Sequence, residues 1–502
     1  MRRGAVALAL ATGAFWWAAW VDATPFLRGP APYPPEWRWP YRRGMPAEID
    51  PAVLACAAGL LGLLVASGSS RARRRPLRSA LLLTGLAIPL GAGLQVSLLG
   101  LEGPRSGLSE LMARTASPAF TQYYNVAIAP EARDVAAFLD GYAGLLPAFH
   151  RQATHAATNP PGAVLFFRAV LALCERSPWL ARAAAARAAA EDPSLAGLPD
   201  GVRARVAALL VAPLALALLG SATALAVLGL ARSLGVEPLA AARIGILWTA
   251  LPGPTLLVPE IDQLLSFLGA SASLLLARAA GRDGAGGPAL AAAAGACLAA
   301  ALFTSYGAAV FAVFAVGFAL APALDRLSPG RLARLGAALA LAPLALLGLL
   351  LLAGYDPIAA FRGSMELHFG AFTLRRSYLA WLLFNPWDLA VFTGLPIALL
   401  CLSQVPGALA ALRRGRRWPA EPASRAKLFA AAALAALFLS GILRGETGRS
   451  LMPLMPFLLL CACVRPLPGS AQATGPDPRQ AAFLAMLLLP TCWLLRVSWR
   501  LP

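Results

Sequence analysis

Apolar stretches about as long as a bilayer is thick recur along most of this 502-residue chain. A membrane-spanning α-helix needs about 20 predominantly apolar residues. Charged residues make up 13% of the sequence and hydrophobic residues 59%, whereas soluble domains carry about 25% charged residues. We therefore predict an all-α, polytopic membrane protein with thirteen transmembrane helices. The expected spans are 4–20, 51–67, 80–101, 206–230, 239–258, 262–278, 289–304, 307–323, 336–353, 387–411, 427–443, 450–464 and 480–496.

Arginine-rich segments indicate which side of the membrane each loop faces, because cytoplasmic loops carry an excess of basic residues. With the N-terminus in the cytoplasm, segments 71–78, 325–334 and 413–418 all become cytoplasmic, and that side holds 22 basic and 5 acidic residues. The opposite side holds 21 basic and 19 acidic residues. The net charge of +19 is thus a topology signal and gives no reason to expect nucleic acid as a partner. The first run is expected to stay as an uncleaved helix, since further spans follow it.

The longest segment between expected spans is an outer loop over residues 102–205. Segments 132–151 and 162–180 within it place apolar residues at helical spacing and polar residues on another face. We expect both to form amphipathic helices that lie in the membrane interface without crossing it.

Two of the three histidines of the chain, His150 and His155, lie in this outer loop. A pair of zinc ligands on one helix would be four residues apart, and no third ligand is near in sequence. We therefore expect hydrogen-bonding roles beside a substrate, shared with Asn159. The Pro160-Pro161 step that follows is expected to open a helix, whose N-terminus attracts anions.

Charged residues also gather at two expected helix ends on the outer side. Glu260 and Asp262 could bind a divalent metal or act as a base and its orienting partner, or simply favour the helix dipole. Arg444 and Arg449 could hold a phosphate, with Glu446 orienting one of them, or could anchor the chain at the interface. No ATPase P-loop, G-x-S-x-G or H-E-x-x-H motif accompanies these residues.

The order of these features resembles the GT-C membrane glycosyltransferases. Members of that family commonly show a Pro-Pro step in a long outer loop, here in Asn159–Gly162, and an Asp at the outer start of a later helix, here Asp262. Arg449 followed by Pro453 is similar to an outer helix end of bacterial members.

The resemblance implies three parts of the chain. Residues 80–353 would form the seven-helix module that contains outer loop 102–205, and residues 1–79 would add two helices before it. Residues 354–502 would form the variable C-terminal part, with its own outer loop and helices.

The resemblance also implies a function. A sugar would be transferred from a polyprenyl phosphate or diphosphate to a glycan, lipid or protein acceptor on the extracytoplasmic face of a bacterial inner membrane. A carboxylate of the outer loop would act as the base, and arginines would hold the lipid phosphate. The acid that the family places before a tyrosine is missing here, because Thr121 and Gln122 precede Tyr123. Asp140, and next Glu110, are expected in that role.

Two other readings compete with the enzyme. A flippase or exporter of lipid-linked saccharides would place polar groups along a path through the bilayer, whereas this chain concentrates them at one face. A non-catalytic membrane protein of the cell envelope would use the same charges as anchors.

Overall fold

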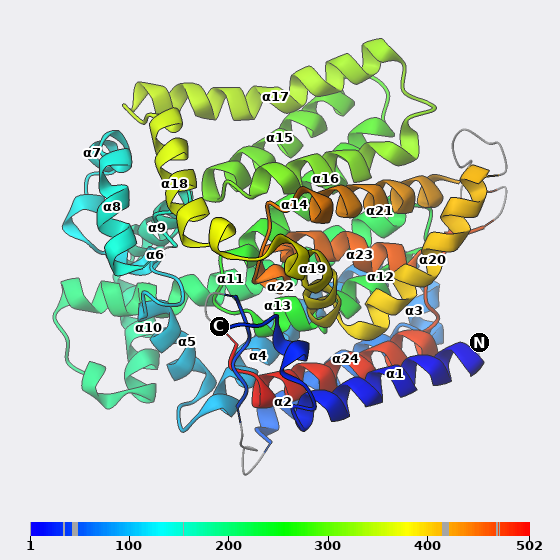
Figure 1. The fold of residues 1–502 in the computed structure, drawn as a ribbon, viewed down its shortest axis with the longest axis horizontal. Helices are drawn as coiled ribbons and strands as arrows, with labels where there is room; N and C mark the ends of the chain where they lie inside the picture. The colour runs from blue at the N-terminus through cyan, green and yellow to red at the C-terminus, as the bar shows by residue number, and fades with distance from the viewer. Residues whose placement is uncertain are drawn as a thin grey trace.

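The protein is a bundle of helices whose long members run roughly parallel to one another (Figure 1). The computed structural model describes residues 2–33, 36–42, 49–153, 155–413, 421–467, 470 and 472–501. Across these ranges the strands are limited to one short antiparallel pair, β1 (Arg465–Pro466) and β2 (Ala473–Thr474). The predicted class, a helical membrane protein, is confirmed at this level.

Seven helices in the described ranges are long and apolar enough to cross a bilayer, or eight if α19 and α20 form one span bent by 119°. These helices are α4 (Pro76–Leu99), α11 (Asp200–Ser233), α14 (Asp262–Ala280), α15 (Gly286–Thr304), α17 (Pro329–Leu352), α21 (Pro422–Ser440), α24 (Pro478–Ser498), and the pair α19 (Tyr378–Thr393) and α20 (Leu395–Arg413).

The other predicted spans contain shorter apolar helices. They are α1 (Arg2–Trp20), α2 (Pro51–Ala66), α12 (Pro238–Trp248), α16 (Ala308–Leu320) and α23 (Met455–Cys463). Every predicted span therefore contains a helix, but a count of thirteen crossings stays a prediction.

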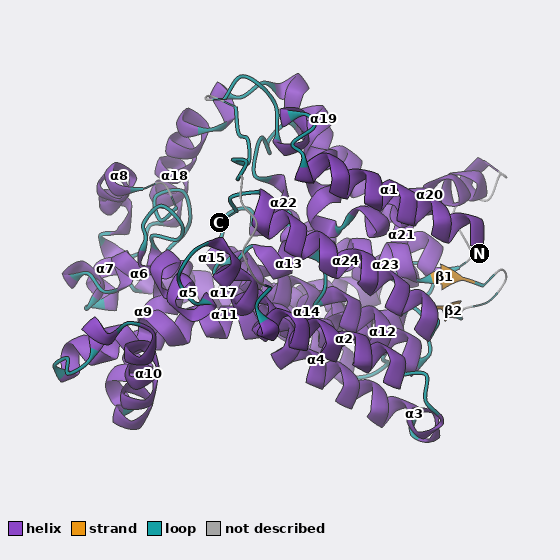
Figure 2. Ribbon diagram, turned by 90° about the horizontal axis from the view of Figure 1, so that it is seen from below, coloured by secondary structure: helices purple, strands orange, loops and turns teal. Residues whose placement is uncertain are grey.

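The remaining helices connect the long ones, mostly at one end of the bundle. They are α3 (Ser70–Arg74), α5 (Gly107–Ala116), α6 (Tyr123–Ala127), α7 (Val135–Asp140), α8 (Tyr142–Gln152), α9 (Gly162–Arg176), α10 (Pro178–Glu191), α13 (Pro252–Leu256), α18 (Pro357–Ala371) and α22 (Thr447–Ser450). Helices α5 to α10 gather at the end opposite the N-terminus, which we call the loop end (Figures 1 and 2). The N-terminus, α3 and the β1–β2 pair lie at the other end, the N-end (Figure 2).

The bundle is held together by close contacts between small residues, as in other membrane helix packings. A Cβ added to Gly295 of α15 would lie 2.1 Å from the Leu339 carbonyl oxygen of α17. The largest apolar cluster joins residues from Phe15 to Leu501, so helices from both ends of the sequence share one core.

The predicted outer loop folds into a second apolar cluster. Its core includes Phe138, Tyr142 and Phe167, and it packs against the first half of α11. Helices α7, α8 and α9 fall within the two segments expected to be amphipathic. Pro161 precedes the first residue of α9, as the Pro-Pro step predicts.

The start of α9 yields a test of this packing. A Cβ on Gly162 would lie 2.1 Å from the Phe303 carbonyl oxygen, and neither atom can move away unless the backbone shifts. We expect Gly162→Ala to destabilise the protein by about 1–3 kcal/mol, measured as a lower thermal unfolding midpoint in detergent. Gly144→Ala in α8 is the matched control, because nothing lies within 4 Å of its added Cβ. An unchanged midpoint for Gly162→Ala would contradict the contact.

Candidate functional site

Four charged side chains from distant parts of the sequence meet beside α22 and the start of α14. The Arg449 guanidinium lies 2.8 Å from a carboxylate oxygen of Glu446 and 3.5 Å from one of Glu260. Asp262, the first residue of α14, lies close enough to Arg449 for a strong electrostatic interaction. We call Glu260, Asp262, Glu446 and Arg449 the acid–arginine cluster.

Glu260 is the most buried acid of the cluster, with 2% of its surface exposed. Burial raises the pKa of Glu260 to about 7, although Arg449 acts in the opposite direction. Its Oε1 has no hydrogen-bond partner among the described residues, while Oε2 faces Arg449. A buried carboxylate with a near-neutral pKa and one free oxygen has the properties of a general acid or base.

Arg449 keeps its charge in this surrounding. Burial alone disfavours a guanidinium cation, but Glu446, Glu260 and Asp262 outweigh it and raise the pKa of Arg449. Three carboxylates around one arginine leave the cluster able to carry a negative charge, which suits a cationic or electron-poor group.

A chain of hydrogen bonds leads from the turn between α15 and α16 to Tyr123, which lies near the cluster. Ser305 donates to Oδ1 of Asn159 at 3.0 Å, and Nδ2 of Asn159 donates to the Tyr123 hydroxyl at 3.2 Å. Tyr123 is 3% exposed and interacts electrostatically with Arg449, Asp262 and Glu260. Burial raises the pKa of Tyr123, so its hydroxyl keeps its proton. Asn159 thus positions Tyr123, and its amide is engaged within the protein.

The two histidines of the loop differ in their surroundings. His155 lies beside Tyr123, and its Nε2 bonds to the Ala119 carbonyl oxygen at 3.3 Å. Because that partner is an acceptor, Nε2 carries a proton. Burial, with Arg449, lowers the pKa of His155 to about 4, so the ring is neutral at pH 7. His150 lies on α8 with Nδ1 buried and without a partner in the described ranges.

Unusual backbone conformations occur on both sides of the cluster. Gln122, directly before Tyr123, and Glu446 have φ of +51° and +48°. Gln122 is held by its own side chain, whose amide donates to the Phe149 carbonyl at 2.9 Å and accepts from the Ala156 amide at 3.0 Å. Left-handed conformations of such residues persist where the surrounding structure fixes them, and they are frequent at functional sites.

Helix α19 fixes the segment that carries Glu446 and Arg449. Asn385 donates to the Leu443 carbonyl at 2.8 Å and accepts from the Thr447 hydroxyl at 2.6 Å. Asp388, one turn later, accepts from the Gly448 amide at 2.7 Å. It also accepts from the indole of the buried Trp39 at 2.9 Å.

Arg444 does not point at the cluster, contrary to the expectation of a paired arginine clamp. Its guanidinium donates to the carbonyl oxygens of Gly441, Thr373 and Arg376 at 2.8–2.9 Å. These bonds connect the end of α21 to the segment between α18 and α19. Arg376 lies nearby, and its guanidinium donates to the Arg444 carbonyl oxygen. It interacts electrostatically with Glu446 and Arg449, and its guanidinium lies over the Trp37 and Phe372 rings.

Asp140 and Glu110, expected as candidate bases, make their contacts elsewhere. Glu110 pairs with Arg114 at 3.1 Å and with Arg105 at 3.5 Å. Asp140 is exposed at the end of α7 and lies against Gly354, where an added Cβ would be 2.4 Å from its carboxylate. In the described structure, the ion pairs of Glu110 and the contact of Asp140 are all with residues outside the acid–arginine cluster. Their catalytic role stays a prediction.

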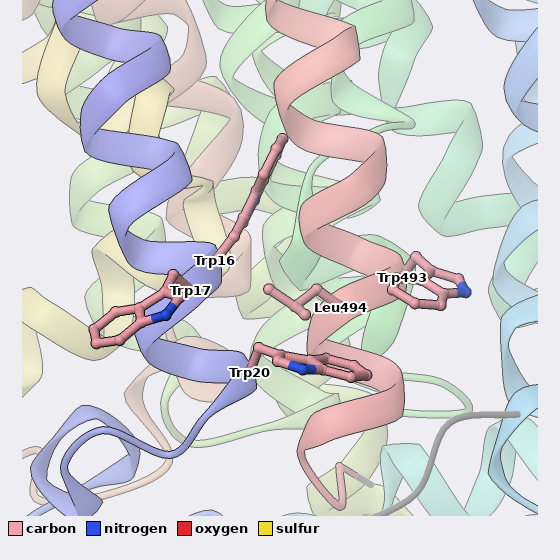
Figure 3. A pocket seen from close by; sticks show the side chains of 5 residues that line it. All are labelled: Trp16, Trp17, Trp20, Trp493 and Leu494. Carbon is pink, nitrogen blue, oxygen red and sulfur yellow. The ribbon is translucent and has the colours of Figure 1, made fainter.

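An aromatic groove lies between α1 and α24. Figure 3 shows Trp16 and Trp20 directed from α1 toward α24, where Trp493 and Leu494 complete the lining. The Trp20 and Trp493 rings stack at 6.4 Å, and Trp16 donates to the Thr491 hydroxyl at 2.8 Å.

No metal centre is evident in the described ranges, where no three His, Cys, Asp or Glu side chains are grouped for metal binding. Comparison with family models, curated proteins and solved structures finds no match to this chain. A functional assignment therefore depends on the chemistry of the site.

The raised pKa of Glu260 predicts how stability changes with pH. The folded protein holds this proton more tightly than the unfolded chain, so stability is full below about pH 4.5 and falls as pH rises through 7. Glu260→Gln removes the ionisation. We expect the thermal unfolding midpoint to fall between pH 5 and pH 8 by less in this variant than in the native protein. The corresponding difference in the free energy of unfolding is on the order of 3 kcal/mol. Equal falls would show that Glu260 ionises normally.

Proposed function

We propose that this chain is a membrane glycosyltransferase that takes a sugar from a polyprenyl phosphate or diphosphate donor and passes it to a glycan, lipid or protein acceptor. The observation that carries the proposal is Glu260, a buried carboxylate with a near-neutral pKa beside other acids and Arg449, whose Oε1 has no hydrogen-bond partner in the part of the chain that the structure describes. Transfer of a glycosyl group needs this combination, because a base must activate the acceptor while positive charge develops on the sugar.

Glu260 is assigned the role of base in this proposal, in place of Asp140 or Glu110. Its free oxygen accepts the proton of the acceptor hydroxyl, which then attacks the anomeric carbon. Asp262 and Glu446 lie beside it and stabilise the oxocarbenium character of the transition state. The Tyr123 hydroxyl accepts from Asn159 and donates to the His155 carbonyl oxygen at 3.5 Å, so we assign Tyr123 to shaping the wall of the site.

Arg376 and Arg449 are assigned to the phosphate of the leaving group. Arg449 forms an ion pair with Glu446, and Arg376 interacts with Glu446 electrostatically. Paired guanidinium groups bind phosphate oxygens and neutralise the charge that develops as the donor bond breaks. Arg444 acts indirectly, since it fixes the Arg376 backbone.

The proposal includes thirteen spans, a cytoplasmic N-terminus and an extracytoplasmic site in a bacterial inner membrane. Support comes from the arrangement of charge: the arginine-rich α3 lies at the N-end, whereas α22, which carries Arg449, lies between α3 and the helices of the loop end (Figures 1 and 2). The tryptophans of the α1–α24 groove suit the headgroup level, where indole rings gather.

Transfer can be tested with purified protein in nanodiscs and a panel of radiolabelled polyprenyl-phosphate and polyprenyl-diphosphate sugars. We expect release of lipid phosphate by transfer or hydrolysis. Glu260→Gln should lower the rate at least about 100-fold, because a general base commonly contributes that much or more. Glu175→Gln is the matched control, since this acid is half-exposed and pairs only with Arg168 at 3.2 Å among the described residues.

The same assay separates the competing base assignments. Asp140→Asn and Glu110→Gln should keep most of the activity if Glu260 is the base. Loss of activity in one of these variants, with Glu260→Gln still active, would move the assignment to that residue. No turnover of any donor in the panel would favour the carrier or the non-catalytic membrane protein.

A further inference from the structure

Helix α3 and the start of α4 present a run of arginines at the N-end of the bundle (Figure 2). Segment 71–78 contains five arginines and no acid, and all five are exposed. The Arg73 guanidinium donates to the Gly68 carbonyl oxygen at 2.8 Å. The other four have no side-chain hydrogen bond or ion pair with any described residue, and we call them the basic platform: Arg71, Arg74, Arg75 and Arg78.

The turn that carries the basic platform is fixed to the rest of the bundle. Arg243 of α12 is 6% exposed, and its guanidinium donates to the Ser67 hydroxyl and to the Pro476 carbonyl oxygen, each at 2.8 Å. Ser69 caps α3 by accepting a hydrogen bond from the Ala72 amide at 3.2 Å. Because the backbone of the turn is fixed in this way, the platform arginines stay near one another.

The acid nearest to this turn in the fold serves another purpose. Asp477 directly follows Pro476, and its carboxylate accepts from the Gln480 amide at 2.8 Å, which caps α24. Arg71 and Arg74 lie three residues apart on α3, a spacing at which like charges repel each other. Four neighbouring guanidinium groups without a carboxylate partner in the described chain favour an anionic ligand from outside the protein.

The arginine of the platform that belongs to α4 begins an apolar face of that helix. Arg78, Leu82 and Leu86 are spaced four residues apart, so their side chains follow one side of α4. Leu82 is 61% exposed and Leu86 is 46% exposed. Helix α4 is also long and apolar enough to cross a bilayer. A ligand on this side of α4 therefore meets cations at the end of the helix and apolar side chains further along it.

We propose that the basic platform binds the phosphate of an anionic phospholipid, such as phosphatidylglycerol, whose acyl chains lie along Leu82 and Leu86. Arginine clusters beside a membrane-spanning helix attract anionic lipids. A soluble polyanion matches the arginines but not the apolar face. A zwitterionic lipid matches the apolar face, but it carries an ammonium group that the arginines repel.

This site asks more of the segment than membrane orientation does. A basic excess is sufficient to orient a helix, whatever the arrangement of its side chains. Lipid binding depends on the fixed turn, the unpaired guanidinium groups and the apolar face of α4 together. The inference goes beyond the proposed glycosyl transfer and does not depend on it.

The test is native mass spectrometry of the purified full chain, delipidated in a neutral detergent. The probes are phosphatidylglycerol and phosphatidylcholine with identical acyl chains. We expect phosphatidylglycerol to bind at least about tenfold more tightly, because each basic residue near an anionic lipid contributes a factor of about five. Replacing all four platform arginines by glutamine should abolish this preference, and a higher concentration of ammonium acetate should weaken it in the native chain.

A matched variant separates the platform from the total charge. It removes the same number of charges from exposed arginines of the loop end, and it should keep the preference; the replaced residues are Arg133, Arg151, Arg176 and Arg182. Equal binding of the two lipids by the native chain, or a preference that salt leaves unchanged, would overturn the site. So would a platform variant that keeps the preference. Displacement of phosphatidylglycerol by an equal concentration of glycerophosphoglycerol, the headgroup without chains, would overturn a lipid as the ligand.

Discussion

The burial of the Arg449 charge among carboxylates is the constraint on which the site depends. An uncompensated buried charge costs several kcal/mol, so Arg449 requires acids at its side, and these acids require Arg449. Glu446 lies in the same short segment, but Glu260 and Asp262 come from a part of the chain almost 190 residues earlier. The start of α14 and the segment before α23 must therefore meet, which fixes how the two halves of the bundle pack.

Different residues form the acid–arginine cluster and hold it in place. Among the described residues, Oε1 of Glu260 has no hydrogen-bond partner, whereas Asn385 and Asp388 of α19 form hydrogen bonds with the segment that carries Arg449. The Asn159 side-chain amide likewise donates a hydrogen bond to the Tyr123 hydroxyl. Supporting hydrogen bonds of this kind fix the geometry of a site. They also explain why several polar residues near the site have no atom left for a substrate.

Much of the helical framework could be predicted from sequence, since apolar runs and proline positions report local structure. Glu260, Asp262, Glu446 and Arg449 could be singled out because acids and arginines are rare beside such runs. The partners of Arg444 could not, because its bonds go to backbone oxygens 68 and 71 residues away. Arg376 and Tyr123 were absent from the expected site, as only the folding of two loops brings them there.

The direct test of the central interaction is a double-mutant cycle between Glu260 and Arg449, measured as thermal unfolding midpoints at pH 8. Arg449→Gln alone should destabilise the protein strongly, by about 3–5 kcal/mol, because it leaves buried carboxylates unpaired. Glu260→Gln should destabilise the Arg449→Gln variant by about 1–3 kcal/mol less than it destabilises the native protein. Additive effects of the two substitutions would contradict the account, because they would show that these side chains do not interact.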